Sequence, residues 1–103
     1  MMSLVIYKYI LNRDENGYCS VTLPLNAETL DVQFQRGVCC LWALVNPDEK
    51  SREDIFFRVL LTGEPLKVPI DKTAGRRAFG LRGKYLKTLQ LDSLVYHVFQ
   101  VQK

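Results

Sequence analysis

Hydrophobic and polar residues are arranged along this chain in the patterns of β-strands, most clearly between Leu30 and Val45. Residues 30–35 alternate apolar with polar side chains, so one face of that strand can be buried and the other wetted. Residues 38–45 read Val-Cys-Cys-Leu-Trp-Ala-Leu-Val and are apolar on both faces, which is typical of a strand covered on both sides. We therefore predict a hairpin that turns at Gly37, with its second limb as the central strand.

The N-terminal part of the chain predicts two further strands. Residues 4–10 are dominated by β-branched and aromatic side chains, and the polar cluster at residues 12–17 ends in Asn-Gly, a frequent turn sequence. Residues 18–23 alternate again, and we expect them to return antiparallel to the first strand. That strand ends at Pro24, which cannot donate a hydrogen bond to a neighbouring strand.

The C-terminal part predicts three more strands. Residues 46–54 are charged and contain a proline, which indicates a surface loop. Residues 55–62 predict a strand antiparallel to the central one, ended by Gly63 and Pro65. Residues 85–91 and 94–101 predict a last hairpin about Asp92 and Ser93.

No window of eleven residues shows the 3.6-residue apolar period of a helix, whereas at least six segments suit strands. The predicted fold is all-β, a small antiparallel meander of about six to seven strands closed into a sandwich or a barrel. A chain of 103 residues is one domain by size. We expect that domain to carry a basic loop insertion at about residues 64–84.

Composition places the chain among ordinary soluble domains, with 48% hydrophobic and 24% charged residues. No apolar run approaches the roughly 20 residues that a membrane-spanning helix needs. The N-terminus lacks the basic start, apolar core and cleavage site of a secretion signal, so we expect a cytoplasmic protein with no membrane partner.

Charge is unevenly distributed, because the segment from Lys67 to Lys87 holds seven basic residues and one acid. It therefore carries a formal +6, whereas the rest, with seven basic and ten acidic residues, carries −3. Three glycines in this segment leave backbone amides accessible, and glycine-rich loops with arginines can cradle a phosphate or carboxylate. The candidate anion-binding residues are Arg76, Arg77, Arg82 and Lys84. The alternative is a solvated insertion kept soluble by its charges.

Other chemistry has weaker support. Binding of nucleic acid would need exposed aromatic residues among the basic ones, and only Phe79 and Tyr85 are present. Trp42 is predicted to be a core residue, and His97 a buried imidazole with one hydrogen-bond partner. Three cysteines and one distant histidine indicate free thiols that act as small buried hydrophobes, with no metal site and no cofactor.

Several motifs give the chain a resemblance to a known family. They are Ile6-Tyr7-Lys8-Tyr9, the run from Val32 to Gly37, the block Cys40-Leu41-Trp42-Ala43-Leu44-Val45-Asn46-Pro47, and the closing Leu94-Val95-Tyr96-His97-Val98-Phe99. In these the chain resembles small uncharacterised proteins encoded by bacteriophages and prophages. The resemblance implies a phage origin and a β-rich fold, and brings no catalytic residue. It departs at Glu64, where relatives have a histidine.

These observations lead us to expect a small non-enzymatic, phage-encoded binding protein that acts in the host cytoplasm. As an antagonist of host antiviral defence it would bind a host protein or sequester an anionic signalling nucleotide. That expectation rests on the type of gene. The alternative is a structural or assembly component of the phage particle, in which a homo-oligomer pairs its exposed edge strands.

Overall fold

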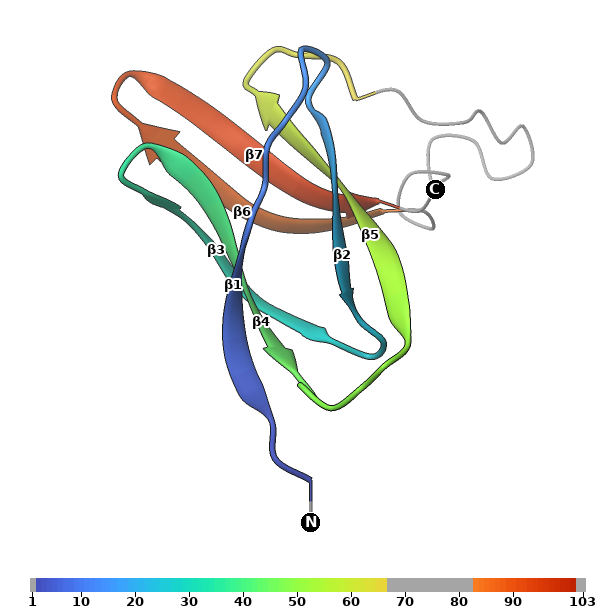
Figure 1. Cartoon of the computed structure of the whole chain (residues 1–103). Helices are drawn as coiled ribbons and strands as arrows, with labels where there is room; N and C mark the ends of the chain where they lie inside the picture. Colours follow the sequence, from blue (N-terminus) through green and yellow to red (C-terminus); the bar gives the residue numbers. More distant parts are fainter. Residues whose placement is uncertain (1, 67–82, 102–103) are drawn as a thin grey trace, which may run out of the picture.

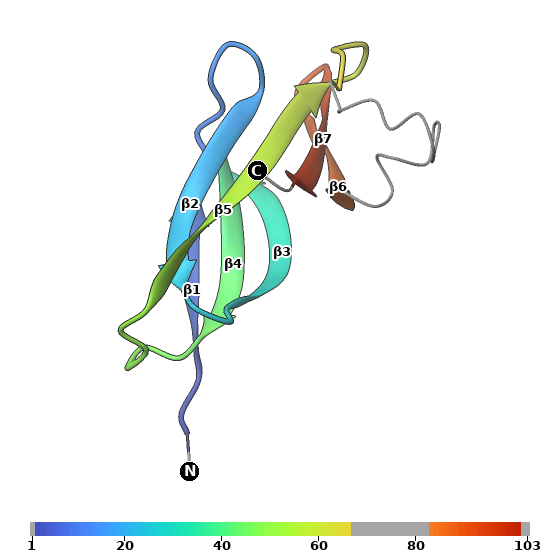
Figure 2. The same cartoon turned by 90° about the vertical axis from the view of Figure 1, so that its right-hand side faces the viewer.

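The computed structural model describes residues 2–66 and 83–101, which form seven antiparallel strands in two sheets (Figure 1). One sheet has the order β1-β4-β3 and contains β1 (Val5–Ile10), β4 (Val38–Val45) and β3 (Glu28–Gln35). The other has the order β2-β5-β7-β6 and contains β2 (Tyr18–Pro24), β5 (Arg52–Leu61), β7 (Leu94–Val101) and β6 (Gly83–Leu91). Figure 2 shows the sheets as two layers, with β2 and β5 in front of β1 and β4.

The all-β prediction is confirmed, and the architecture is that of a sandwich. The barrel alternative is wrong, because no ladder of the described strands joins one sheet to the other. The described residues contain no helix long and apolar enough to cross a membrane.

Both predicted hairpins form. β3 and β4 pair antiparallel from Gln35 opposite Val38, across a turn in which Arg36 and Gly37 have φ of 53° and 80°. Two successive positive φ angles are those of a type I′ turn, whose twist matches that of the flanking strands. β6 and β7 pair across Asp92, which also has a positive φ. β4 is the centre of its sheet, as predicted.

The predicted pairing of the first two strands is wrong. β1 pairs with β4, and β2 pairs with β5 in the opposite sheet. The chain crosses between layers at residues 11–17, because Leu11 continues along β4 by donating its N–H to Cys39 (2.9 Å). Asp14 then shapes a wider turn by accepting the N–H groups of Asn16 and Tyr18.

The expected pairing of the strand at 55–62 with the central strand is also wrong. β5 lies between β2 and β7, in the sheet opposite β4. It begins at Arg52, three residues earlier than expected, because Arg52, Glu53 and Asp54 pair with the end of β2. Backbone pairing thus extends the strand into a charged sequence that by composition predicts a loop.

The core lies between the two sheets and takes alternate residues from each strand. In β4 the inward side chains are those of Cys39, Leu41, Ala43 and Val45, and Leu41 and Ala43 have no exposed surface. Phe57 of β5 and Val98 of β7 are equally buried on the opposite side. One sheet therefore supplies small and branched side chains, and the other contributes the single fully buried aromatic ring in the described part of the chain.

Trp42 does not belong to this core, which corrects the prediction. It lies with Cys40 and Leu44 on the other face of β4, where it is only partly buried. In the described residues no third layer covers that face, so apolar residues on both sides of β4 do not mean burial on both sides.

Leu30 also departs from its predicted place in the alternation. A bulge between Thr29 and Asp31 shifts the register of β3 against β4, and Leu30 is 45% exposed. Val32, beyond the bulge, is 1% exposed and packs in the core as expected. The extra residue therefore removes one apolar side chain from the buried set.

A substitution at Gly17 tests how closely the chain is packed where it crosses between the two layers. Its φ is +84°, and a Cβ there would lie 2.8 Å from Cδ2 of Leu60 and 2.9 Å from the carbonyl oxygen of Val59. We expect Gly17→Ala to lower the free energy of unfolding by about 3 kcal/mol in urea titrations, roughly 1 from the left-handed backbone and roughly 2 from overpacking.

Gly37→Ala is the matched control. Gly37 has nearly the same φ, +80°, with open space around the position of a Cβ, so only the backbone cost of about 1 kcal/mol applies. Equal losses in the two variants would contradict the close packing at Gly17.

Candidate functional site

The predicted anion-binding residues fall mainly outside the described residues. Arg76, Arg77 and Arg82 all lie there, together with most of the basic loop predicted at 64–84. Lys84 is described: it is exposed near the beginning of β6 and is paired in register with Gln100. The final residues of the predicted loop therefore belong to a strand. The anion-binding site stays a prediction.

His97 is only partly buried and has two partners, where the sequence predicted burial and one partner. Its Nε2 lies 2.7 Å from Oγ1 of Thr62, and its Nδ1 lies 3.0 Å from Oγ1 of Thr88. Thr88 in turn lies 2.6 Å from the hydroxyl of Tyr85. Both ring nitrogens are thus engaged by hydroxyl groups, and neither is oriented by a carboxylate as a catalytic histidine usually is.

The three cysteines are free thiols, as predicted, with Cys39 and Cys40 buried and Cys19 partly buried. Burial raises the pKa of Cys19 to about 12 and that of Cys39 to about 11. These two groups are therefore protonated at neutral pH, which disfavours them as nucleophiles or metal ligands. No group of three His, Cys, Asp or Glu residues in the described segments could hold a metal ion.

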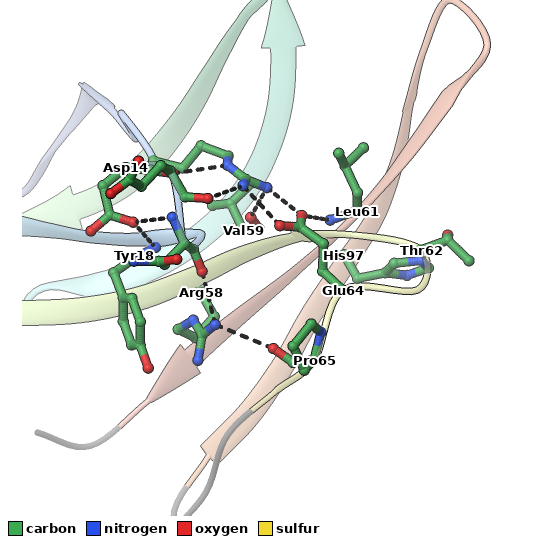
Figure 3. A network of polar contacts seen from close by, with 12 residues as sticks. Asp14, Tyr18, Arg58, Val59, Leu61, Thr62, Glu64, Pro65 and His97 are labelled. Atoms are coloured by element: carbon green, nitrogen blue, oxygen red, sulfur yellow. Dashed lines mark hydrogen bonds and ion pairs between the residues drawn. The ribbon is translucent and has the colours of Figure 1, made fainter.

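A network of charged residues ties the β1–β2 crossing to the end of β5 (Figure 3). Nη1 and Nη2 of Arg13 donate to the two carboxylate oxygens of Glu64 at 2.6 and 3.0 Å, and Nη1 also donates to the carbonyl of Val59 at 2.9 Å. Glu64 accepts the N–H of Leu61 at 2.7 Å as well. Its carboxylate therefore closes the turn after β5 while it binds Arg13 in a bidentate pair.

Arg58 is the second cation of this network and is 3% exposed. Its guanidinium lies 3.7 Å above the ring of Tyr18, and Nη2 donates to the carbonyls of Asn16 (3.0 Å) and Pro65 (3.4 Å). These contacts hold two turns against each other and stack the charge on an aromatic face. We assign the network a structural role, because the bonded groups belong to turns and strand ends.

The surface best suited to binding lies on the opposite layer. The outward residues of β4 run beside those of β1, with Ile6 opposite Leu44, Lys8 opposite Trp42 and Ile10 opposite Cys40. We call this surface the Trp42 face and define it by Ile6, Ile10, Val38, Trp42 and Leu44. Ile6, Ile10 and Val38 are 58%, 49% and 39% exposed.

One end of the Trp42 face is a shallow depression lined by Ile10, Val38 and Cys40 together with Lys8 and Arg36. Nζ of Lys8 reaches across β4 from β1 and donates to Oε1 of Gln35 on β3 at 2.8 Å. Cys40 lies between these strands and is only 2% exposed. Lys8 and Arg36 therefore place two cations beside the apolar residues at this end of the face, whereas Asp31 of β3 lies opposite Trp42.

A comparison with family models gives one match. The model described as Domain of unknown function (DUF7352) matches residues 2–103. The chain belongs to this family. No match was found among curated proteins, and none among solved structures. The DUF7352 assignment agrees with the predicted resemblance to an uncharacterised family, and the phage origin stays a prediction.

Sequence reasoning missed both the Trp42 face and the Arg13–Glu64 pair in this DUF7352 domain. A signal for the face was present, since β4 is apolar on both sides while its neighbour β3 is polar on its outward side. No signal could have found the pair, because its members are 51 residues apart and belong to different turns.

The Arg13–Glu64 pair predicts a pH dependence of stability. The hydrogen bonds from Arg13 and then from Leu61 lower the pKa of Glu64 from 4.5 to about 2. A depressed pKa means that the folded protein binds this proton less readily than the unfolded chain. The stabilisation is therefore complete above pH about 4.5 and is lost as the pH falls to about 2. We expect the melting temperature of Glu64→Gln to depend less on pH between about 4.5 and about 2 than that of the unmodified protein.

Glu15→Gln is the control, since this neighbouring side chain is exposed and outside the pair. It should leave the pH dependence of the melting temperature intact. If Glu64→Gln and the unmodified protein lose stability in parallel between pH 4.5 and 2, the pair does not have this role.

Proposed function

We propose that this DUF7352 protein is a non-enzymatic binding protein that holds a protein partner on its Trp42 face. The observation that carries the proposal is the exposure of Ile6, Ile10 and Val38 beside Trp42 on a sheet face that no described element covers. A cluster of exposed apolar side chains with a polar border is typical of protein interaction sites.

The border of the face suggests the chemistry of the partner. Lys8 and Arg36 line the same depression as Ile10 and Val38. A partner surface with an apolar centre and an acidic group near these two cations would be complementary in both shape and charge.

The potentially reactive side chains support binding rather than catalysis. His97 is engaged by threonine hydroxyls on both ring nitrogens, and burial keeps Cys19 and Cys39 protonated. Arg13 and Glu64 are fully occupied by each other and by backbone groups. Thr62 and His97 are within hydrogen-bond distance, but the other ring nitrogen is bound by Thr88 and not by a carboxylate that would orient the imidazole as a base.

The resemblance to phage proteins suggests the setting. As part of the proposal, the protein is phage-encoded, acts in the host cytoplasm and antagonises host antiviral defence by capping a host protein. This step rests on the type of gene, and a fold alone does not specify such a role.

The test of the docking proposal is Val38→Glu in protein purified from the cells in which it acts. Val38 is exposed at the beginning of β4, so the substitution should leave folding intact while placing a negative charge beside Lys8 and Arg36, where the acidic group of the partner is expected to bind. We expect the partner that co-purifies with the unmodified protein to dissociate at least tenfold more readily, measured by surface plasmon resonance.

Leu94→Glu is the matched control, because Leu94 is 46% exposed in the other sheet. It should bind as the unmodified protein does. A partner that Val38→Glu retains at full affinity, or the absence of any partner on the unmodified protein, would contradict the proposal.

Sequestration of an anionic nucleotide is the second form of the proposal, carried by the basic composition around Arg76, Arg77, Arg82 and Lys84. Replacement of Arg76 and Arg77 by alanine should abolish calorimetric binding of a nucleotide and leave thermal unfolding nearly unchanged. Intact binding in that double variant would refute the assignment.

A structural or assembly role in the phage particle is the alternative function, favoured by the open edge of β1. Light scattering separates the two functions: open-ended polymers or co-purification with particles favour assembly, and a closed small oligomer favours the soluble antagonist.

A further inference from the structure

β1 has one hydrogen-bonding edge that no described strand occupies. It pairs with β4 on one side only, and it is the first strand in the order of its sheet. The direction of its backbone groups follows from the contact just beyond it, where Leu11 donates its N–H to Cys39. Because pairs with hydrogen bonds alternate with pairs without them in an antiparallel ladder, Tyr7 and Tyr9 bond to β4. The N–H and C=O groups of Ile6, Lys8 and Ile10 then point to the open side.

The other edge strands carry features that discourage pairing with another chain. β3 has a bulge between Thr29 and Asp31, and β6 has one between Tyr85 and Lys87. β2 ends in Pro24, which has no N–H to donate. Bulges, prolines and edge charges are the usual protection of exposed edges. β1 has neither bulge nor proline, and its register against β4 is regular from Val5 to Ile10. Its one charge, Lys8, is directed across β4 to Gln35 and so away from the open edge.

Exposed apolar side chains are concentrated on this same strand and on Leu4, the residue just before it. Leu4, Ile6, Tyr7 and Ile10 are 48%, 58%, 48% and 49% exposed. They lie on both faces of the strand, so a partner strand beside β1 would cover apolar surface on each side of the sheet. Lys8 is the single charge within β1, and it lies near the middle.

We propose that β1 pairs antiparallel with β1 of a second copy of this chain, with Tyr7 opposite Tyr7 at the two-fold axis. In this register Ile6 lies opposite Lys8 of the second copy, and Leu4 lies opposite Ile10. The free backbone groups then bond in pairs across the axis. A register centred on Lys8 would set two like charges directly opposite each other, which is unfavourable in a sheet.

Self-pairing would join the two three-stranded sheets into one of six strands. The outward side chains of both copies would lie on the same side, so two Trp42 faces would become one continuous surface. Self-pairing therefore rests on the proposed function for its biological role, because it would enlarge the surface that binds the partner. The evidence for the pairing is the open edge of β1.

Sedimentation equilibrium of the full chain tests the pairing. We expect a closed dimer, and we expect Ile6→Lys to raise its dissociation constant at least tenfold, because two new lysines would each face Lys8 of the other copy. Ile6 is exposed, so the substitution should not prevent folding. Leu94→Lys, an equally exposed site on the other sheet, should leave the dimer unchanged.

A monomer at all concentrations, or a dimer that Ile6→Lys does not weaken, would overturn the inference. A monomer would still leave the Trp42 face open to a partner, since Val38 lies on the central strand. Retention of partner binding in Val38→Glu, together with an intact dimer, would likewise contradict the docking proposal alone, so the two failures can be told apart.

A cysteine scan tests the register independently. Tyr7→Cys places two thiols in a pair without hydrogen bonds, with Cα atoms about 4.5 Å apart, which a disulfide can span. Copper-catalysed air oxidation should crosslink most of this variant. Ile10→Cys places its two thiols about 20 Å apart and should stay uncrosslinked. Crosslinking through position 10 and not through position 7 would overturn the proposed pairing.

Discussion

The rest of the structure depends on how β4 divides its side chains between two environments. Cys39, Leu41, Ala43 and Val45 are almost fully buried against the opposite sheet. The residues between them are also apolar but belong to the outer face of the three-stranded sheet. A sandwich has two layers, so each sheet has one covered face and one exposed face. The strand with the most apolar sequence therefore lines the core with one face and contributes partly buried apolar side chains to the outer surface with the other.

The two sides of the sandwich differ in how they are closed. At one side Lys87 of β6 binds Asp31 of β3 at 2.8 Å, and this hydrogen bond, followed by that from Gln33, lowers the pKa of Asp31. β1 forms the other edge of the three-stranded sheet, and none of the ion pairs among the described residues involves it. Regular backbone and exposed apolar residues thus lie together on β1 and β4, whereas bulges and charges lie on β3 and β6.

Local features of the fold could be read from the sequence, because each has a local cause. The turn at Arg36 and Gly37 and the turn at Asp92 lie between runs with the period of a strand, and both form as predicted. The pairing partners could not be read in this way. β1 and β2 are separated by a turn that suits a hairpin, and only the side-chain bonds of Asp14 and the continuation of Leu11 along β4 send them to different sheets.

The candidate site shows the same division. An apolar residue at position 42 could be recognised, but periodicity reports only that a face is apolar and not whether another layer covers it. Arg13 and Glu64 meet through the fold alone. Arg76, Arg77 and Arg82 were selected by composition and lie outside the described residues, so their role in binding an anion remains a prediction.

Quenching of tryptophan fluorescence by acrylamide tests the central claim most directly, because Trp42 is the one tryptophan of the chain. A partly buried indole on an uncovered sheet face should be quenched in the native protein, and quenched further after unfolding in urea. Native fluorescence that acrylamide leaves unchanged until the protein unfolds would place Trp42 in the interior and contradict the account.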